Sequence, residues 1–356
     1  MARVVTGIYD GTRSGDAYID GLISGFRWPA GTTITYAFPT TTSSYSPDYK
    51  DGEELTSNFA GVSLFMQEAF EGFIHGTRSG TSNAMTLSPI EGFTNLRFAK
   101  HNDPDASSLI RIASSSFVDT AWAYYPGAEI EGDIWFGQNF MGEDPFATPT
   151  STTYGHAVAM HELGHALGLK HPFEIYMPED VLLPGDKDGY EYTIMAYSQM
   201  PTIPPSLHAG AVTYSGGHPQ TYMMLDIAAL QYLYGANYGF RADDTVYSWS
   251  ETTGEAFVNG VAQGRDANGL LEDARSIFQT LWDGSGIDTY DLSNYTTNLQ
   301  LDLDPGGKSI FSQAQRTHLG WTTKGDYYAA NVYNALLHKG DLRSLIENAK
   351  GGRATM

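Results

Sequence analysis

The chain has 356 residues, of which 41% are hydrophobic and 17% charged, which is enough apolar material for one large domain or two of ordinary size. Its 41 acidic and 20 basic residues give a net charge of −21, which disfavours nucleic-acid binding because phosphate backbones are repelled. There is no cysteine, so disulfides, thiolate zinc ligands and a Cys-held latent form are excluded. No apolar run approaches the roughly 18 residues that a membrane span needs, and we expect no membrane partner.

The acidic excess has two interpretations that the composition leaves open. It can serve as a solvated, solubilising surface. It can also bind divalent cations, because Ca²⁺ prefers carboxylate and carbonyl oxygens.

The first half of the chain alternates strand-like and helix-like segments. Apolar residues at helical spacing predict an amphipathic helix over 55–73. A Thr/Ser/Pro-rich stretch precedes a second helix, over 154–169. In chain order we expect a strand over 33–38, a helix over 55–73, strands over 96–98, 109–112 and 132–136, and a helix over 154–169.

The composition changes in the second half. After an irregular stretch over 172–220, a helix is predicted over 223–234, closed by Gly235. From there the chain is rich in Gly, Asp, Asn, Thr and Tyr, with short strand-like runs at 245–247 and 299–303. We therefore predict one domain over 1–236 and a small all-β region over 237–356.

The segment His161-Glu162-Leu163-Gly164-His165 carries two histidines four residues apart. In a helix they lie on one face, so both imidazoles can reach one zinc ion. Gly168 permits a sharp turn with a backbone angle closed to other residues, and this turn returns His171 as a third ligand.

Three imidazoles leave a position open for water, which is typical of catalytic rather than structural zinc sites. Glu162, next to the first ligand, can act as the general base that takes a proton from this water. Two alternatives remain at this point. The chain could be a binding protein that keeps zinc as a staple, or a hydrolase of a non-peptide substrate.

At these residues the chain resembles the metzincins, whose motif is followed by a Met-turn. Met195 in the segment 192–198 matches that Met. The resemblance implies an α+β catalytic domain with a twisted mixed sheet and a zinc-binding helix, and hydrolysis of internal peptide bonds. Tyr197 resembles the tyrosine that the serralysin and astacin branches use as a switchable zinc ligand that stabilises the oxyanion.

Two further segments resemble serralysins in particular. Residues 225–237 resemble the helix that closes their catalytic domain. Residues 132–136 resemble the edge strand with which a peptide substrate pairs antiparallel. The substrate-binding residues implied are Gly132, Asp133, Ile134, Trp135 and Phe136.

In serralysins a calcium-binding β-roll follows the catalytic domain, and residues 241–245 and 282–289 resemble its first segments. Asp283 and Asp288 would supply carboxylates, and Glu347 resembles a ligand of a neighbouring ion. The remaining calcium ligands implied are Arg241, Asp243, Thr245, Ser285 and Gly286. Asp and Gly are also common in tight turns, so this pattern alone is ambiguous.

The chain departs from the family in two ways. Asp243 stands where the family tends to have Gly, and family members continue with tandem Gly-Gly-x-Gly-x-Asp repeats where this sequence reaches Gly351 and Gly352 and stops. We therefore expect a truncated β-roll without an evident C-terminal export signal. The N-terminus lacks the apolar run of a Sec signal peptide, so we expect export, if it occurs, to use another route. The resemblance still implies a secreted monomer that acts on proteins, with a proteinaceous inhibitor as a conceivable further partner.

Overall fold

The computed structural model describes residues 6–46, 49, 52–76, 86–104, 107–127, 130, 132–140, 142–198, 217–263, 275–319 and 327–352. Part of the irregular stretch predicted over 172–220 and the last four residues lie outside these ranges. In the described part, no helix is long and apolar enough to cross a membrane.

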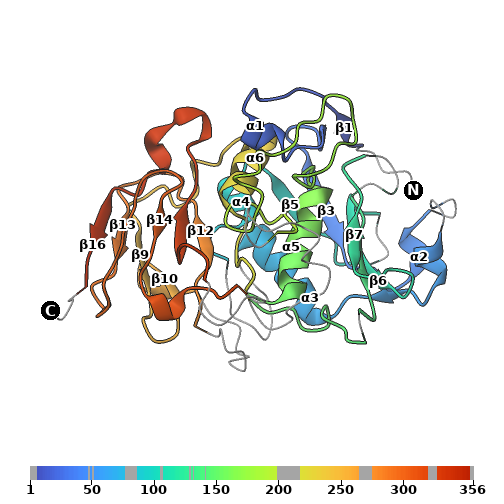
Figure 1. The fold of residues 1–356 in the computed structure, drawn as a ribbon. Coiled ribbons are helices and arrows are strands. Elements are labelled where there is room, and N and C mark those ends of the chain that lie inside the picture. Colours follow the sequence, from blue (N-terminus) through green and yellow to red (C-terminus); the bar gives the residue numbers. More distant parts are fainter. Residues whose placement is uncertain are drawn as a thin grey trace.

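A mixed sheet of six strands lies in the first part of the chain (Figure 1). Its strands are β3 Thr33–Ala37, β4 Ala60–Gly61, β5 Arg97–Lys100, β6 Ile110–Ser115, β7 Ala121–Ala123 and β8 Ile134–Gly137. They run in the order β5-β3-β6-β8-β7, and β4 pairs with β6. The pairs along β5-β3-β6-β8 are parallel, whereas β7 runs antiparallel to β8 and forms an edge. A separate small hairpin pairs β1 Ile8–Tyr9 with β2 Phe26–Arg27.

The prediction that residues 132–136 form the edge strand is wrong. The strand in this segment, β8, pairs with β6 on one side and with β7 on the other. Ile134, Trp135 and Phe136 have no exposed surface, and buried Asp133 accepts a hydrogen bond of 2.9 Å from Arg111 Nε. An unbroken apolar run of this kind is typical of a central strand, whose backbone groups are already paired.

Two helices near the sheet pack against each other, α3 Leu64–His75 and α5 Tyr154–Ala166. Their first turns are capped by side chains: Ser63 Oγ accepts from Met66 N at 3.1 Å, and Thr153 Oγ1 accepts from His156 N at 3.4 Å. α5 also packs against β7 and β8, which places one face of this helix beside the edge of the sheet.

The helix predicted over 55–73 is split in two. A short helix α2, Glu53–Thr56, is followed by Asn58 with φ +50°, by β4 and only then by α3. The left-handed backbone at Asn58 ends the first helix, because a right-handed helix cannot continue through it. The helix predicted over 223–234 is confirmed as α6 Met224–Tyr234, ending at Gly235 with φ +80°. Two more short helices are α1 Ala17–Asp20 and α4 Ile90–Phe93.

Beyond residue 237, the described residues form strands and 3₁₀ turns. The strands are β9 Val246–Trp249, β10 Ala256–Val258, β11 Val261–Ala262, β12 Gln279–Leu281, β13 Thr289–Asp291, β14 Lys308–Ser309, β15 Val332–Asn334 and β16 Asn348–Lys350. They form a five-stranded sheet in the order β11-β10-β9-β13-β16 and a three-stranded sheet in the order β12-β15-β14 (Figure 1). The strand predicted over 299–303 is instead an isolated bridge between Gln300 and Ile310.

The main hydrophobic core crosses the predicted boundary at residue 237. Phe278, Trp282 and Tyr333 belong to the same buried cluster as Met224 and Ile227. Helix α6 is therefore packed from the C-terminal part of the chain as well as from the first part. The division into 1–236 and 237–356 stays a prediction.

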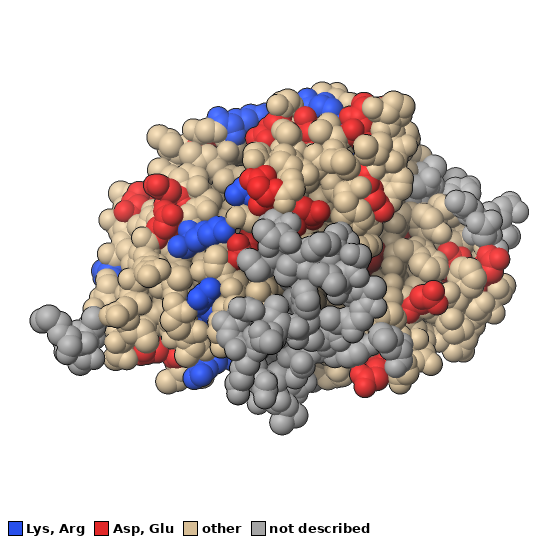
Figure 2. Space-filling model, in the orientation of Figure 1, with Lys and Arg blue, Asp and Glu red and all other residues tan. Residues whose placement is uncertain are grey.

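Charged side chains of both signs are interspersed on the face in Figure 2. The Lys and Arg side chains visible there are scattered among Asp and Glu and form no continuous basic band.

Candidate zinc site

Helix α5 presents two histidines on the same face. His161 and His165 lie four residues apart, their ring centroids are 4.7 Å apart, and both side chains are buried. The Nδ1 atoms of both rings face backbone carbonyls, with His161 at 2.9 Å from Ile194 O and His165 at 2.8 Å from Leu169 O. Donation from Nδ1 to these carbonyls leaves each Nε2 with a free lone pair directed into the site.

Gly168 makes the turn that returns the chain to this face. Its φ is +101°, and a Cβ at this position would lie 2.2 Å from Phe26 O, so only glycine fits. Ser24 N and Ser24 Oγ both donate to Gly168 O, at 2.9 and 2.8 Å, which fixes the turn against the N-terminal segment.

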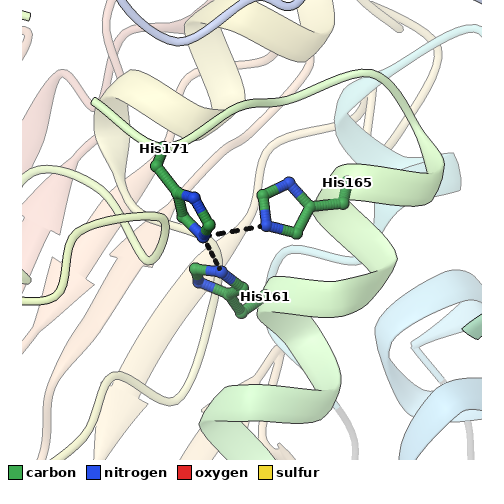
Figure 3. Close-up of side chains that lie close together, drawn as sticks. All are labelled: His161, His165 and His171. Atoms are coloured by element: carbon green, nitrogen blue, oxygen red, sulfur yellow. Dashed lines mark hydrogen bonds between the residues drawn. The ribbon is translucent and has the colours of Figure 1, made fainter. Parts of the chain in front are cut away.

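His171 completes a cluster of three imidazoles. Its Nε2 lies 3.0 Å from His161 Nε2 and 3.1 Å from His165 Nε2 (Figure 3). Among the described residues, these three form the one group of His, Cys, Asp or Glu side chains with the spacing of a metal site. The structure therefore brings together the three ligands expected from the sequence.

The donor set fits zinc. Burial lowers the pKa of His161 to about 3 and the pKa of His165 well below its usual value, so both rings are neutral. With Nδ1 as the donor in each ring, three Nε2 lone pairs converge, and they repel one another unless a cation lies among them. Zn–N bonds of about 2.0–2.1 Å in a tetrahedron place nitrogens roughly 3.3 Å apart, which is close to the distances found here.

Glu162 lies in the same helical turn as His161. Its side chain is buried, its Oε2 atom has no hydrogen-bond partner, and burial raises the pKa of this carboxyl to about 8. A buried carboxyl without a partner costs stability. Its retention beside the histidine cluster therefore points to a chemical rather than a structural role.

The predicted Met-turn lies directly beneath the histidine helix. Met195 is fully buried, and its Sδ atom would lie 2.8 Å from a Cβ built on Gly164, so helix and methionine are in close contact. His161 Nδ1 faces the carbonyl of Ile194, the residue before Met195. This contact connects the turn to the first histidine.

Asp226 holds the Met-turn, and the sequence analysis missed this residue. Its carboxylate accepts from Thr193 Oγ1 at 2.5 Å, from Ile194 N at 2.8 Å and from Met223 N at 2.9 Å. The last of these is a cap by the third residue of α6, a position where Asp is favourable. That local signal was available, whereas the contacts to residues 193 and 194 come from the tertiary structure.

Tyr197 lies at the open side of the cluster. Its ring centroid is 4.6 Å from that of His171 and 5.9 Å from that of His161, and about half of the residue (51%) is exposed. Partial burial raises the pKa of Tyr197, and the charge of Glu162 raises it further. The ring of Phe173 stacks on the ring of His171, with 5.2 Å between their centroids. Its centroid lies 4.9 Å from that of Tyr197.

Glu174 and Lys170 were also missed. Glu174 Oε2 lies 2.5 Å from His171 Nδ1, and Tyr176 OH donates to the same oxygen at 2.6 Å. Burial alone would raise the pKa of Glu174, but these two hydrogen bonds outweigh it and hold the pKa below its usual value. The Lys170 side chain is fully buried, and its Nζ atom donates to backbone carbonyls of the surrounding loop.

The predicted calcium segments lie side by side. Thr245 N donates to Asp288 Oδ1 at 2.8 Å, Glu347 Oε2 accepts from Asp288 N at 2.7 Å, and a Cβ on Gly286 would lie 2.8 Å from Asp243 O. The other carboxylate oxygen of Asp288 is buried without a hydrogen-bond partner. Burial, and then the charge of Asp283, raises the pKa of Asp288 to about 7.

Comparison with known proteins identifies two family matches. Residues 94–183 match the matrixin family, and residues 236–313 match the C-terminal family of M10 serralysin peptidases. The first match includes all three histidines, and the second includes the segments 241–245 and 282–289.

Several curated proteins are similar to the chain. Metallopeptidase AprA of Pseudomonas marginalis is 30% identical over 301 residues, covering 82% of this chain and 55% of the relative. Serralysin C of Dickeya chrysanthemi is 32% identical over 194 residues, covering 53% and 36%. Serralysin of Proteus mirabilis is 30% identical over 242 residues, covering 67% and 44%. The chain thus spans about half the length, or less, of the curated relatives it matches.

Proposed function

This chain belongs to the serralysin-type metzincins, and we propose that it is a zinc metalloendopeptidase that hydrolyses internal peptide bonds of proteins. The observation that carries the proposal is the convergence of three Nε2 lone pairs beside a buried, unpartnered Glu162. His161, His165 and His171 would hold the zinc. When bound there, zinc supplies Lewis acidity that activates a water and stabilises charge on the substrate carbonyl oxygen.

Glu162 would move the proton. Its carboxylate accepts a proton from the attacking water and passes it to the nitrogen of the leaving amine. Burial alone raises the pKa of Glu162 to about 8, and a zinc ion held by the histidines would favour its carboxylate form, which is the form that takes the proton. The lack of a competing hydrogen bond at Oε2 leaves this atom available for the task.

Tyr197 would assist Glu162. As the sequence resemblance implies, its phenol could serve as a further ligand of a zinc ion held by the three histidines, and could move away to donate a hydrogen bond to the oxyanion. The raised pKa of Tyr197 keeps its hydroxyl protonated, as a donor must be. Its half-exposed ring, which touches His171 and Phe173, has the position from which such a movement is possible.

An extended peptide would bind along β7 rather than along residues 132–136. β7 pairs with β8 on one side, and no pairing partner for its other side is found among the described strands. A peptide added antiparallel to β7 uses main-chain hydrogen bonds and therefore accepts many sequences. Because β7 packs against α5, such a peptide passes the histidine cluster.

The C-terminal part would bind calcium through Asp283 and Asp288, with backbone carbonyls of residues 241, 243, 245, 285 and 286 and with Glu347 near a second ion. The buried, unpartnered Asp288 oxygen and the second buried carboxylate at Asp283 support this. Burial, and then the charge of Asp283, disfavours ionisation of Asp288, and Ca²⁺ would relieve this repulsion. Burial also raises the pKa of Asp283, although the guanidinium of Arg241 counteracts part of this rise. We further propose that the protein is secreted, as the resemblance implies, and that the 237–356 region belongs to a calcium-binding β-roll.

Casein hydrolysis tests the enzymatic proposal. The purified full chain is assayed in calcium-containing buffer with and without 1,10-phenanthroline, followed by zinc add-back and by sequencing of the fragments. Cleavage at internal bonds that stops with the chelator and returns with zinc is expected. Stoichiometric zinc binding without any cleavage would instead favour a binding protein that uses zinc as a staple.

A further inference from the structure

The three histidines of the candidate zinc site differ in what their Nδ1 atoms contact. Two of them, His161 and His165, face neutral backbone carbonyls at 2.9 and 2.8 Å. His171 alone faces a carboxylate, Glu174, at 2.5 Å. His171, the third expected ligand, is therefore the one of the three whose Nδ1 atom contacts a charged group.

Glu174 is itself held in place by two hydrogen bonds to one oxygen. Its Oε2 atom accepts a second hydrogen bond from Tyr176 OH, at 2.6 Å. Its side chain is 28% exposed, so water competes only partly for the hydrogen bond with His171. The carboxylate therefore cannot turn away from the ring without leaving Tyr176 as well.

The backbone around Glu174 is fixed by a buried ammonium group. Lys170 Nζ donates to Gly21 O at 2.9 Å, to Glu174 O at 2.9 Å and to Val181 O at 3.0 Å, with His171 O further away at 3.3 Å. A cation enclosed by four carbonyl oxygens draws the surrounding backbone together as a bound metal ion would. It joins both His171 and Glu174 to the N-terminal segment.

We propose that Glu174 is a positioning residue for the third zinc ligand, and that Lys170 fixes the loop that carries it. A carboxylate that accepts the Nδ1 proton fixes the tautomer and the ring orientation of His171. It also increases the basicity of Nε2 and so strengthens the bond of this nitrogen to zinc. The inference rests on the proposed zinc site and deepens it.

Zinc affinity of the full chain tests the inference without recourse to activity. The dissociation constant is measured at neutral pH by competition with a chromophoric chelator, for the wild type and for Glu174→Ala and Glu174→Gln. Gln keeps a hydrogen-bond acceptor but removes the charge, so its effect should lie between the wild type and Ala. For Ala we expect about 10–100-fold weaker zinc binding.

Glu179→Gln is the matched control, because this carboxylate lies in the same loop, is exposed and makes no histidine contact. It should bind zinc as the wild type does. The thermal midpoint of the metal-free protein should also be nearly unchanged by Glu174→Gln, while the rise in midpoint on adding zinc becomes smaller. A merely structural role would lower the midpoint of the metal-free protein as well.

The outcomes separate the inference from the function on which it rests. If the wild type binds zinc and Glu174→Ala binds it equally tightly, the positioning role is wrong and the zinc site stands. If the wild type binds no zinc, the zinc site itself is wrong and the inference with it. Equal weakening in Glu174→Ala and Glu179→Gln would also overturn the inference, since net charge alone would then explain the change.

Discussion

Glu191 and Lys308 form an ion pair of 2.9 Å that joins the segment before Met195 to the C-terminal part of the chain. The Glu191 side chain is 5% exposed, and its other oxygen accepts from Ala329 N. Lys308 Nζ also donates to Tyr192 OH at 2.9 Å. The segment that leads to Met195, beneath the histidines, is thus held by strand β14 as well as by helix α6.

Replacing Lys308 with Met should destabilise the protein, because Glu191 is left buried without its cation. Since the lysine side chain is itself 31% exposed, we expect a loss of about 1–3 kcal/mol rather than the larger cost of a fully buried pair. Urea unfolding at neutral pH measures it. Lys350→Met, which breaks the exposed pair with Asp291, serves as control and should cost less than about 1 kcal/mol. Equal losses of unfolding free energy in the two variants would show that the buried Glu191 depends on its lysine no more than Asp291 does.

Glu162→Gln should lower casein turnover by about 10²–10⁴-fold, because an amide cannot accept the proton of the attacking water. The zinc content, measured by elemental analysis, should stay at the wild-type value, since this side chain is not a ligand. Exposed Glu53→Gln should leave both quantities unchanged. Cleavage at the wild-type rate in Glu162→Gln would mean that the assigned base is wrong.

Gly168→Ala should weaken zinc binding and the fold together. The new Cβ meets Phe26 O at 2.2 Å in a backbone with φ +101°, so strain and a steric clash add to about 2–4 kcal/mol. Thermal unfolding and zinc titration measure the two effects. At Gly185 a Cβ meets nothing within 4 Å, so Gly185→Ala should be within about 0.5 kcal/mol of the wild type. If Gly168→Ala unfolds and binds zinc as the wild type does, the turn can adopt another backbone conformation.

Asp226 should make stability depend on pH. Burial raises its pKa to about 7 despite the hydrogen bonds from Thr193, Ile194 and Met223. The folded state then binds the proton more tightly than the unfolded state, so this contribution is fully present below about pH 4 and is lost as the pH rises through 7. Asp226→Asn cannot ionise, and its unfolding free energy should fall less between these pH values than that of the wild type. Parallel pH curves from urea unfolding would refute the assignment.

Calcium should stabilise the C-terminal part through Asp288. The thermal midpoint of the wild type is expected to rise on adding millimolar calcium, since the cation offsets the repulsion between two buried carboxylates. Asp288→Asn should show a much smaller rise, whereas Asp291→Asn, which removes a partly exposed strand carboxylate paired with Lys350, should respond like the wild type. No calcium effect on the wild type would argue against the site.

The sequence predicted the features that depend on short spacing. Helices over 154–169 and 223–234 are close to α5 and α6, and the three histidines of the motif do meet at one point. It failed where the answer depends on distant partners. The helix over 55–73 is broken at Asn58, and residues 132–136 form an internal strand instead of the edge.

By itself, the sequence determined the histidine cluster, because helical spacing places His161 and His165 together and the Gly168 turn returns His171 within a few residues. Only the tertiary structure decided which strand is the edge, that Asp226 holds the Met-turn, and that Glu191 meets Lys308. Strand order depends on which apolar surfaces pack together in the folded chain. Ion pairs between distant residues depend on which buried polar groups meet there. Local periodicity carries no information on that choice, because the same alternation or apolar run fits more than one place in a sheet.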